Sequence, residues 1–136
     1  MAIFNKFNSF SEAIAEKVHN LGSDTLTVAL TNTLPTASNT QLSNITQIAY
    51  TFLSTRVLTR TSSSQTAGVY TLMISDLTLT STGGATGPFR YVVIYNDTAT
   101  NDELIGWYDS GSGITIPDTG TFLLDLSQVT GLLSIT

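Results

Sequence analysis

Hydrophobic and polar residues alternate along much of the chain, which is the pattern of β-strands with one buried face. Leucine and valine alternate with threonine and alanine over residues 25–31, so a strand with a single buried face is predicted there. Residues 50–61 also alternate, but both sets mix apolar and polar side chains, so the register of that segment stays open. The serine-rich residues 62–68 favour a solvated, flexible loop. Residues 69–80 are predicted to form a long strand that bends at Ser75-Asp76.

The best-defined feature is a predicted β-hairpin over residues 88–109. Its first arm is a run of aromatic and β-branched residues, and its second arm returns from the loop at Leu104. The glycine-rich residues 81–87 precede it and are interpreted as a hairpin loop, because a phosphate-binding loop needs a following helix and lysine. Three short strands are predicted after the hairpin, at Ile114 to Pro117, Thr121 to Leu126 and Gly131 to Thr136.

A single amphipathic helix is predicted near the N-terminus, over residues 9–21. Ser9 and Glu12 fit a capping box, in which each side chain accepts a hydrogen bond from the backbone N–H of the other residue. Gly22 supplies the stop. His19 falls in the last turn, and we interpret it as a helix residue rather than as a ligand or an acid–base group. The apolar stripe of this helix consists of Phe10, Ile14, Val18 and Leu21.

Together these elements predict an all-β protein with one short N-terminal amphipathic helix. About seven to eight strands separated by frequent turns indicate a β-sandwich or a jelly-roll-like barrel. With 136 residues and no repeat or linker, the chain is expected to form one domain, 1–136. Within it, residues 1–8 are a possible N-terminal arm, residues 9–21 the helix and residues 23–136 the sandwich.

The composition removes several classes of chemistry. The chain has no cysteine and one histidine, which excludes disulfides, thiolate metal sites and a cysteine nucleophile. Ten acidic and five scattered basic residues give a net charge of -5, so nucleic acid is not expected as a direct partner. Only 11% of the residues are charged, which is low for the surface of a free monomer and indicates that part of this surface is buried against something else.

The first 21 residues do not have the pattern of a signal peptide or a transmembrane helix. They contain Glu12, Glu16 and Lys17 and lack a continuous apolar stretch. We therefore expect a protein that is made in a cytoplasm, is not exported by the usual route and has no membrane partner.

The densest group of acidic residues lies at the tip and the return arm of the predicted hairpin. Oxygen ligands of this kind suit Ca²⁺, but Asp and Asn also stabilise tight turns, and the alternating acids of a calcium loop are absent. We interpret the group as turn residues, and whether its tip binds a cation stays open. Neither a glycosidase pair nor a Ser-His-Asp set is favoured, so we predict no catalytic residue, no cofactor site and no metal site. The group comprises Asp97, Asp102, Glu103 and Asp109, with Asn96 and Asn101 beside them.

The two ends of the chain carry apolar side chains that are candidates for contact with a partner. Residues 2–7 hold three large apolar residues ahead of the predicted helix, and they either pack on their own domain or dock on a neighbouring subunit. The last predicted strand is apolar and needs a sheet or a partner to cover it. Trp107 and Tyr108 lie on opposite faces of one strand, so one of them points outward if the other is in the core. The candidate contact residues are Ile3, Phe4, Phe7, Trp107, Leu133 and Ile135.

Several of these segments carry a family resemblance. The stretch Gly87 to Asp109 resembles small structural proteins encoded in the virion modules of tailed bacteriophages. The opening Met1 to Phe7, the segment Glu16 to Gly22, and Leu30 to Thr33 with Pro35 are similar to the same family. The resemblance therefore extends over nearly the whole chain.

This resemblance implies a non-enzymatic, β-rich component of a virion, and the position expected for it is that of a capsid decoration or cement protein. Such a protein would be made in the cytoplasm of the bacterial host and would bind the outside of the major capsid protein lattice as a homo-oligomer, for which a trimer is expected. Two alternatives stay open. One is a tail-tube or head-completion protein, and the other is a carbohydrate-binding or receptor-binding module that uses Trp107 or Tyr108.

Overall fold

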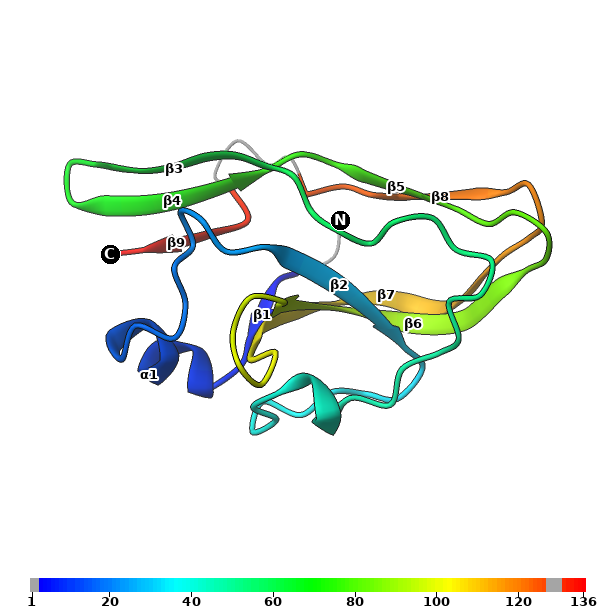
Figure 1. Ribbon diagram of the computed structural model, residues 1–136, viewed down its shortest axis with the longest axis horizontal. Coiled ribbons are helices and arrows are strands. Elements are labelled where there is room, and N and C mark those ends of the chain that lie inside the picture. Colours follow the sequence, from blue (N-terminus) through cyan, green and yellow to red (C-terminus); the bar gives the residue numbers. More distant parts are fainter. Residues whose placement is uncertain (1–2, 127–130) are drawn as a thin grey trace.

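The computed structural model describes residues 3–126 and 131–136 and contains two β-layers packed face to face (Figure 1). One layer is a four-stranded antiparallel sheet in the order β1-β7-β6-β2. Successive side chains of each strand point to opposite faces of this sheet, so both faces of the sheet carry side chains. Its strands are β1 (Asn5–Lys6), β7 (Leu104–Ile116), β6 (Thr86–Asn96) and β2 (Leu26–Thr31).

The second layer consists of two smaller antiparallel sheets that lie side by side over the first (Figure 1). A three-stranded sheet has the order β3-β4-β9, and a two-stranded sheet pairs β5 with β8. The prediction of an all-β sandwich with one short helix is confirmed. The strands of this layer are β3 (Arg60–Thr66), β4 (Val69–Ile74), β5 (Leu77–Thr80), β8 (Thr121–Leu124) and β9 (Leu133–Ile135).

The predicted hairpin is the centre of the larger sheet. β6 and β7 pair from Tyr95 and Leu104 at the loop to Thr86 and Ile116 at the far end, which makes both arms longer than predicted. The register shifts three times along this pair. β7 also takes in residues 114–116, which the sequence placed in a separate strand.

The prediction that the strand over residues 25–31 has one buried face is wrong, because all six residues of β2 are buried. Val28 and Leu30 face the main core, which lies between the two layers. Ala29 faces the other side of the sheet, where a second cluster contains Ile45, next to the short 3₁₀ helix η1 (Leu42–Asn44). The segment around η1 therefore covers the face that the alternation of β2 assigned to solvent.

The N-terminal helix is shorter than predicted. α1 spans Ser9–Ala15, and Asn8 precedes it without a capping hydrogen bond from its side chain. The predicted capping box is therefore wrong. The helix ends because Lys17 adopts a left-handed backbone, with φ of 65°. Val18 and Leu21 thus lie beyond the helix and do not continue its apolar stripe.

Two further predictions are corrected. The serine-rich residues 62–66 belong to strand β3, although residues 67 and 68 do form the turn to β4. β3 is an edge strand with mostly exposed side chains, so it needs no alternation of polar and apolar residues. The glycine-rich residues 81–87 do not close a hairpin, because β5 and β6 belong to different sheets. The bend at Ser75-Asp76 is confirmed as the break between β4 and β5.

None of the helices in the described residues is long and apolar enough to span a membrane.

Candidate functional site

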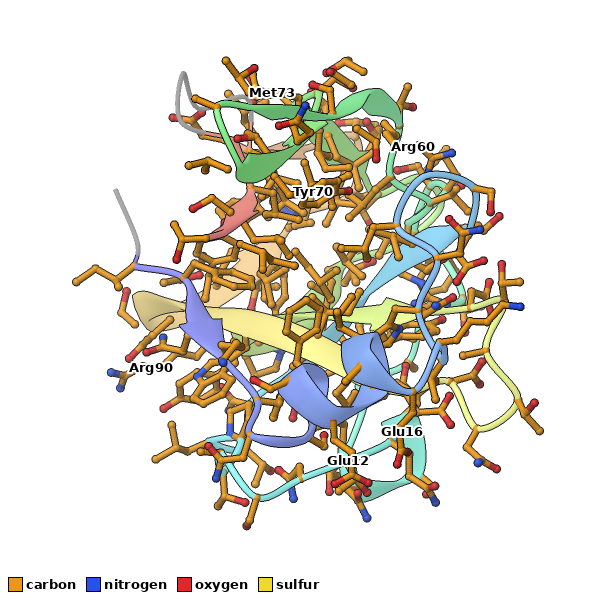
Figure 2. All side chains as sticks on the ribbon, turned by 90° about the vertical axis from the view of Figure 1, so that its left-hand side faces the viewer. Glu12, Glu16, Arg60, Tyr70, Met73 and Arg90 are labelled. Carbon is orange, nitrogen blue, oxygen red and sulfur yellow. The ribbon has the colours of Figure 1, made fainter. Side chains whose placement is uncertain are left out.

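A groove opens between α1 and the inner face of the β3-β4-β9 sheet (Figure 2). Its volume is about 430 Å³. Tyr70 on β4 points from the sheet toward α1, and its hydroxyl lies 2.8 Å from the Oγ of Ser63 on β3. We call this opening the helix-side groove, and its wall includes Ile14, Lys17, His19, Gly22, Tyr70 and Ile135.

The helix-side groove is basic, although the chain as a whole is acidic. Lys17 lies in its wall, and no Asp or Glu does. Glu12 and Glu16 of the same helix segment point away from the three-stranded sheet (Figure 2). Over residues 3–126 and 131–136, no hydrogen bond or ion pair engages the ammonium group of Lys17, whereas Arg90 is paired with Asp109. The groove therefore combines an apolar surface with an unneutralised positive charge.

Behind the groove wall, a buried polar cluster ties the α1–β2 loop to the end of β6. The side-chain nitrogen of Asn96 donates to Asp24 Oδ2 at 2.6 Å and lies 3.0 Å from His19 Nδ1. The side-chain oxygen of Asn96 accepts from the backbone N–H groups of Thr98 and Ala99. Because the Asn96 amide donates in both directions, Nδ1 of His19 is the acceptor and the proton of the neutral ring is on Nε2.

His19 is only 5% exposed, and its ring stacks on that of Phe10 at a centroid distance of 5.5 Å. Burial lowers the pKa of His19, while the nearby carboxylates of Glu103 and Asp24 act in the opposite direction. Nε2 has no hydrogen-bond partner among the described residues. The N–H on Nε2 is therefore a buried donor without a hydrogen-bond partner among the described residues.

A second opening lies between the outer part of β7 and β8. We call it the β8 hollow, with a volume of about 490 Å³ and a wall that includes Tyr108, Ser110, Ile114, Phe122, Leu123 and Asp125. Burial and the charge of Asp125 raise the pKa of Tyr108 to about 12. In contrast to the helix-side groove, no Lys or Arg lies in this wall.

An apolar and acidic projection borders the β8 hollow. Leu123 is 56% exposed, and Asp125 is also exposed, whereas Leu124 and Leu126 are buried. Asp125 follows the last residue of β8, and exposure alternates from Leu123 to Leu126, so Leu123 and Asp125 share the exposed side. Among the described residues, β8 pairs with β5 alone, which leaves its other edge open. We call Leu123 and Asp125 the β8 knob.

The predicted contact residues near the N-terminus have three different environments. Ile3 is 79% exposed. Phe4 is half-buried, lies over Gly106 and packs on Tyr108 with ring centroids 5.5 Å apart. Phe7 is fully buried, with its ring 4.6 Å from that of Trp107. Of the two alternatives for this segment, packing on its own domain describes Phe4 and Phe7, and among its described apolar residues Ile3 alone is open to a partner.

The remaining predicted contact residues do not form one surface. Trp107 is half-buried and faces the second cluster with Phe7, while Tyr108 on the opposite face packs on Phe4. Leu133 is buried opposite Leu72 of β4. Ile135 is half-buried and lies in the wall of the helix-side groove. The structure thus brings only Ile135 to one of the two openings.

The acidic residues of the hairpin are distributed over several local contacts. Asp109 pairs with Arg90 at 2.7 Å, and this hydrogen bond lowers the pKa of the Asp109 carboxyl. Asn101 donates to Glu103, and Asp102 adopts a left-handed turn backbone with φ of 51°. In the part of the chain that the structure describes, no group of three or more His, Asp or Glu side chains is placed to hold a metal ion.

The sequence did not predict the cluster of His19, Asp24 and Asn96. Asn96 is 77 residues from His19 and 72 from Asp24 along the chain. The available signal was a single histidine in the segment between the N-terminal helix and the next strand, and one asparagine at the end of an apolar strand. Neither signal specifies that the two residues meet.

No protein-family model, no curated protein and no solved structure matches this chain. The fold defines it as an all-β protein of two packed layers with one short helix.

Proposed function

We propose that this protein is a non-enzymatic structural component of a bacteriophage virion, and that it binds the outside of the major capsid protein lattice as a decoration or cement protein. In this role it would assemble as a homo-oligomer, for which we propose a trimer, and would stabilise the head by adding contacts between neighbouring capsid subunits. Its place would be the capsid surface, after synthesis in the host cytoplasm.

One observation carries the proposal beyond the family resemblance. A chain with few charges exposes several large apolar side chains, each from a different part of the fold. A cement protein needs such contacts, because many small apolar areas add to a large total on a repeating lattice. The exposed large apolar residues are Ile3, Leu34, Phe52, Val57, Val69 and Leu123.

The carbohydrate-binding alternative receives less support. A sugar-stacking platform requires an aromatic face that is open to solvent. Trp107 is half-buried against Phe7, and Tyr108 is half-buried against Phe4. The tail-tube or head-completion alternative shares the β-fold and differs in assembly, because it requires a ring of six or more copies.

The test uses purified phage heads that lack this protein. Wild-type protein is added, the heads are pelleted, and the bound copies are counted. Thermal disruption of the heads is then followed with and without the protein. We expect saturable binding at a fixed ratio to the capsid subunit and a higher disruption temperature for decorated heads. Absence of binding to heads, with binding to tails instead, would reject the cement role.

A matched pair of variants tests the N-terminal contact. Ile3→Glu places a charge on an exposed contact candidate, whereas Thr78→Glu places one at an exposed site of β5. We expect Ile3→Glu to reduce occupancy on heads and Thr78→Glu to leave it unchanged. Removing the whole segment is a poorer test, because it also removes the buried Phe7.

A further inference from the structure

The helix-side groove and the β8 knob carry apolar side chains and opposite charges. The helix-side groove presents apolar side chains from α1, β4 and β9 beside the ammonium group of Lys17 and contains no carboxylate. The β8 knob presents one exposed leucine at the end of β8 and one exposed carboxylate directly after this strand. β8 lies on the opposite side of the molecule from α1 in Figure 1.

We propose that the protein associates with a second copy of itself head to tail, with the β8 knob of one copy seated in the helix-side groove of the next. In this arrangement Leu123 contacts the apolar wall formed by Ile14, Tyr70 and Ile135, and Asp125 faces Lys17. The inference rests on the proposed assembly into a homo-oligomer and names the surfaces that form it.

Charge supports a second copy as the occupant. Opposite charges across an interface favour binding, and like charges disfavour the wrong orientation. Two helix-side grooves brought together would place Lys17 against Lys17, and two β8 knobs would place Asp125 against Asp125. Groove on knob is the pairing that opposes unlike charges, so the interface joins different surfaces of the two copies. Such heterologous contacts close into rings or continue as filaments.

Burial supports the same pairing. Leu123 is among the most exposed large apolar residues of the described chain, and a leucine that leaves water for an apolar pocket is stabilised. The groove volume of about 430 Å³ accommodates a leucine and a carboxylate side chain. Within the described residues β8 pairs with β5 alone, so this strand can approach a neighbour without losing pairs within its own sheet.

The chain offers a matched pair of glycines for the first experiment. A Cβ on Gly22, in the groove wall, would come no closer than 3.4 Å to its neighbours, and a Cβ on Gly113 would meet nothing within 4 Å. Both substitutions to glutamate therefore fit the folded chain and add the same charge. Sedimentation velocity and native mass spectrometry on the purified protein, without phage heads, then measure self-association.

We expect Gly22→Glu to weaken self-association by about tenfold or more, because its carboxylate opposes Asp125 and its side chain occupies the groove. Gly113→Glu should associate like the wild type. On the other side of the interface, Leu123→Glu should weaken association to a similar degree, whereas Val57→Glu, at another exposed apolar residue, should not. Circular dichroism and thermal unfolding confirm that each variant is folded.

Mixing the two defective variants tests the head-to-tail geometry. Gly22→Glu keeps an intact knob, and Leu123→Glu keeps an intact groove. One functional interface is therefore available between them, and we expect a one-to-one heterodimer that neither variant forms alone. An interface between identical surfaces would give no such product.

Exchanging the charges tests the ionic contact. Lys17→Glu alone and Asp125→Lys alone should each weaken association, and the two changes in one chain should restore it. The proposal is overturned if the wild type is monomeric at its highest soluble concentration. It is also overturned if Gly22→Glu and Gly113→Glu associate equally, or if the mixture yields no heterodimer. Failure of head binding by an oligomeric wild type would reject the cement role alone.

Discussion

The helix-side groove and the β8 hollow are both openings between the two layers, but they are built by different means. A network of buried polar side chains fixes the helix side, where His19, Asp24 and Asn96 hold the α1–β2 loop on β6. The β8 side is fixed by strand pairing and by aromatic packing, including the contact of Phe89 with Phe122. The first opening is basic and the second acidic.

The two sides are stabilised differently because α1 is a very short helix, whereas β8 is a fully paired strand. α1 has seven residues, and a helix of that length is marginal unless tertiary contacts hold it. Buried Phe10 and Ala13 give it a small apolar contact, and the polar cluster next to it supplies directional bonds. β8 needs no such cluster, because all four of its residues pair with β5. Disturbing the two sides should therefore have different consequences.

The largest effect is expected from Asn96→Ala. The Asn96 side chain is fully buried and bonds to groups on two loops, so its removal takes the hydrogen-bond partner from His19 Nδ1 and from two backbone N–H groups, and leaves Asp24 Oδ2 with the backbone N–H of Asn20. We expect the free energy of unfolding to fall by about 3 kcal/mol. Chemical denaturation measures this loss, and hydrogen exchange should show faster opening of residues 9–24 than of residues 104–126.

Asn101→Ala is the control for that variant, because Asn101 is an exposed residue of the loop that follows β6, and among the described residues its side chain bonds to Glu103 alone. A loss for Asn96→Ala no larger than that for Asn101→Ala would contradict the structural role of the buried cluster.

A smaller effect is expected from Gly106→Ala. This substitution disturbs Phe4, which packs on Tyr108 in the wall of the β8 hollow. An added Cβ would overlap the ring of Phe4 and lie 2.7 Å from the backbone oxygen of Asn5, so β1 and Phe4 must move. We expect a loss of about 2 kcal/mol and greater exposure of Tyr108. Unfolding by denaturant, with tyrosine absorbance as a second readout, measures both. Gly113→Ala, with open space around it, should change neither.

The pH dependence of stability reports on the helix side alone, because His19 is the single histidine of the chain and lies on that side. Burial lowers the pKa of folded His19 below the ordinary value of 6.5. The unfolded state then binds the proton more readily, so this contribution to stability is complete above pH 6.5 and is lost as pH falls toward the folded pKa. Each unit of lowering corresponds to about 1.4 kcal/mol.

The chain has a single histidine, so one resonance reports its titration by NMR. We expect a midpoint below 6.5 and a neutral ring protonated on Nε2. His19→Gln removes the titrating group and should flatten the fall in stability between pH 7 and pH 5. A midpoint at or above 6.5 would contradict the assigned burial and tautomer.

The smallest effect is expected from Arg90→Gln. The Arg90–Asp109 pair is surface-exposed, and such ion pairs contribute little to stability because water and salt screen them. We expect no measurable change in the melting temperature at physiological salt. The pKa of Asp109, which the Arg90 hydrogen bond lowers, should return toward its ordinary value, and carboxyl NMR titration measures this.

The sequence predicted the parts of the fold that depend on neighbouring residues. The aromatic and β-branched run at 89–95 favours a strand in almost any context, and the hairpin that contains it is the longest pair in the structure. The break at Ser75-Asp76 was also predictable, because it interrupts two apolar segments.

Predictions failed where the deciding contact came from a distant segment. Residues 62–66 are polar on both faces and become a strand because β4 offers a partner edge. The helix was expected to reach residue 21, but it ends after Ala15 so that the following loop can bring His19 and Asp24 to Asn96. The second face of β2 is buried because the segment with Ile45 folds over it.

The sequence by itself determined the all-β class, the central hairpin, the single N-terminal helix and the shortage of charge. Each of these follows from composition or from short-range periodicity, which need no knowledge of the fold. Only the tertiary structure decided that Lys17 stands in a groove without carboxylates, that Leu123 and Asp125 share an outer face, and that His19 is buried against Asn96. Those features arise from packing between residues far apart in the chain, and local patterns do not encode such distances.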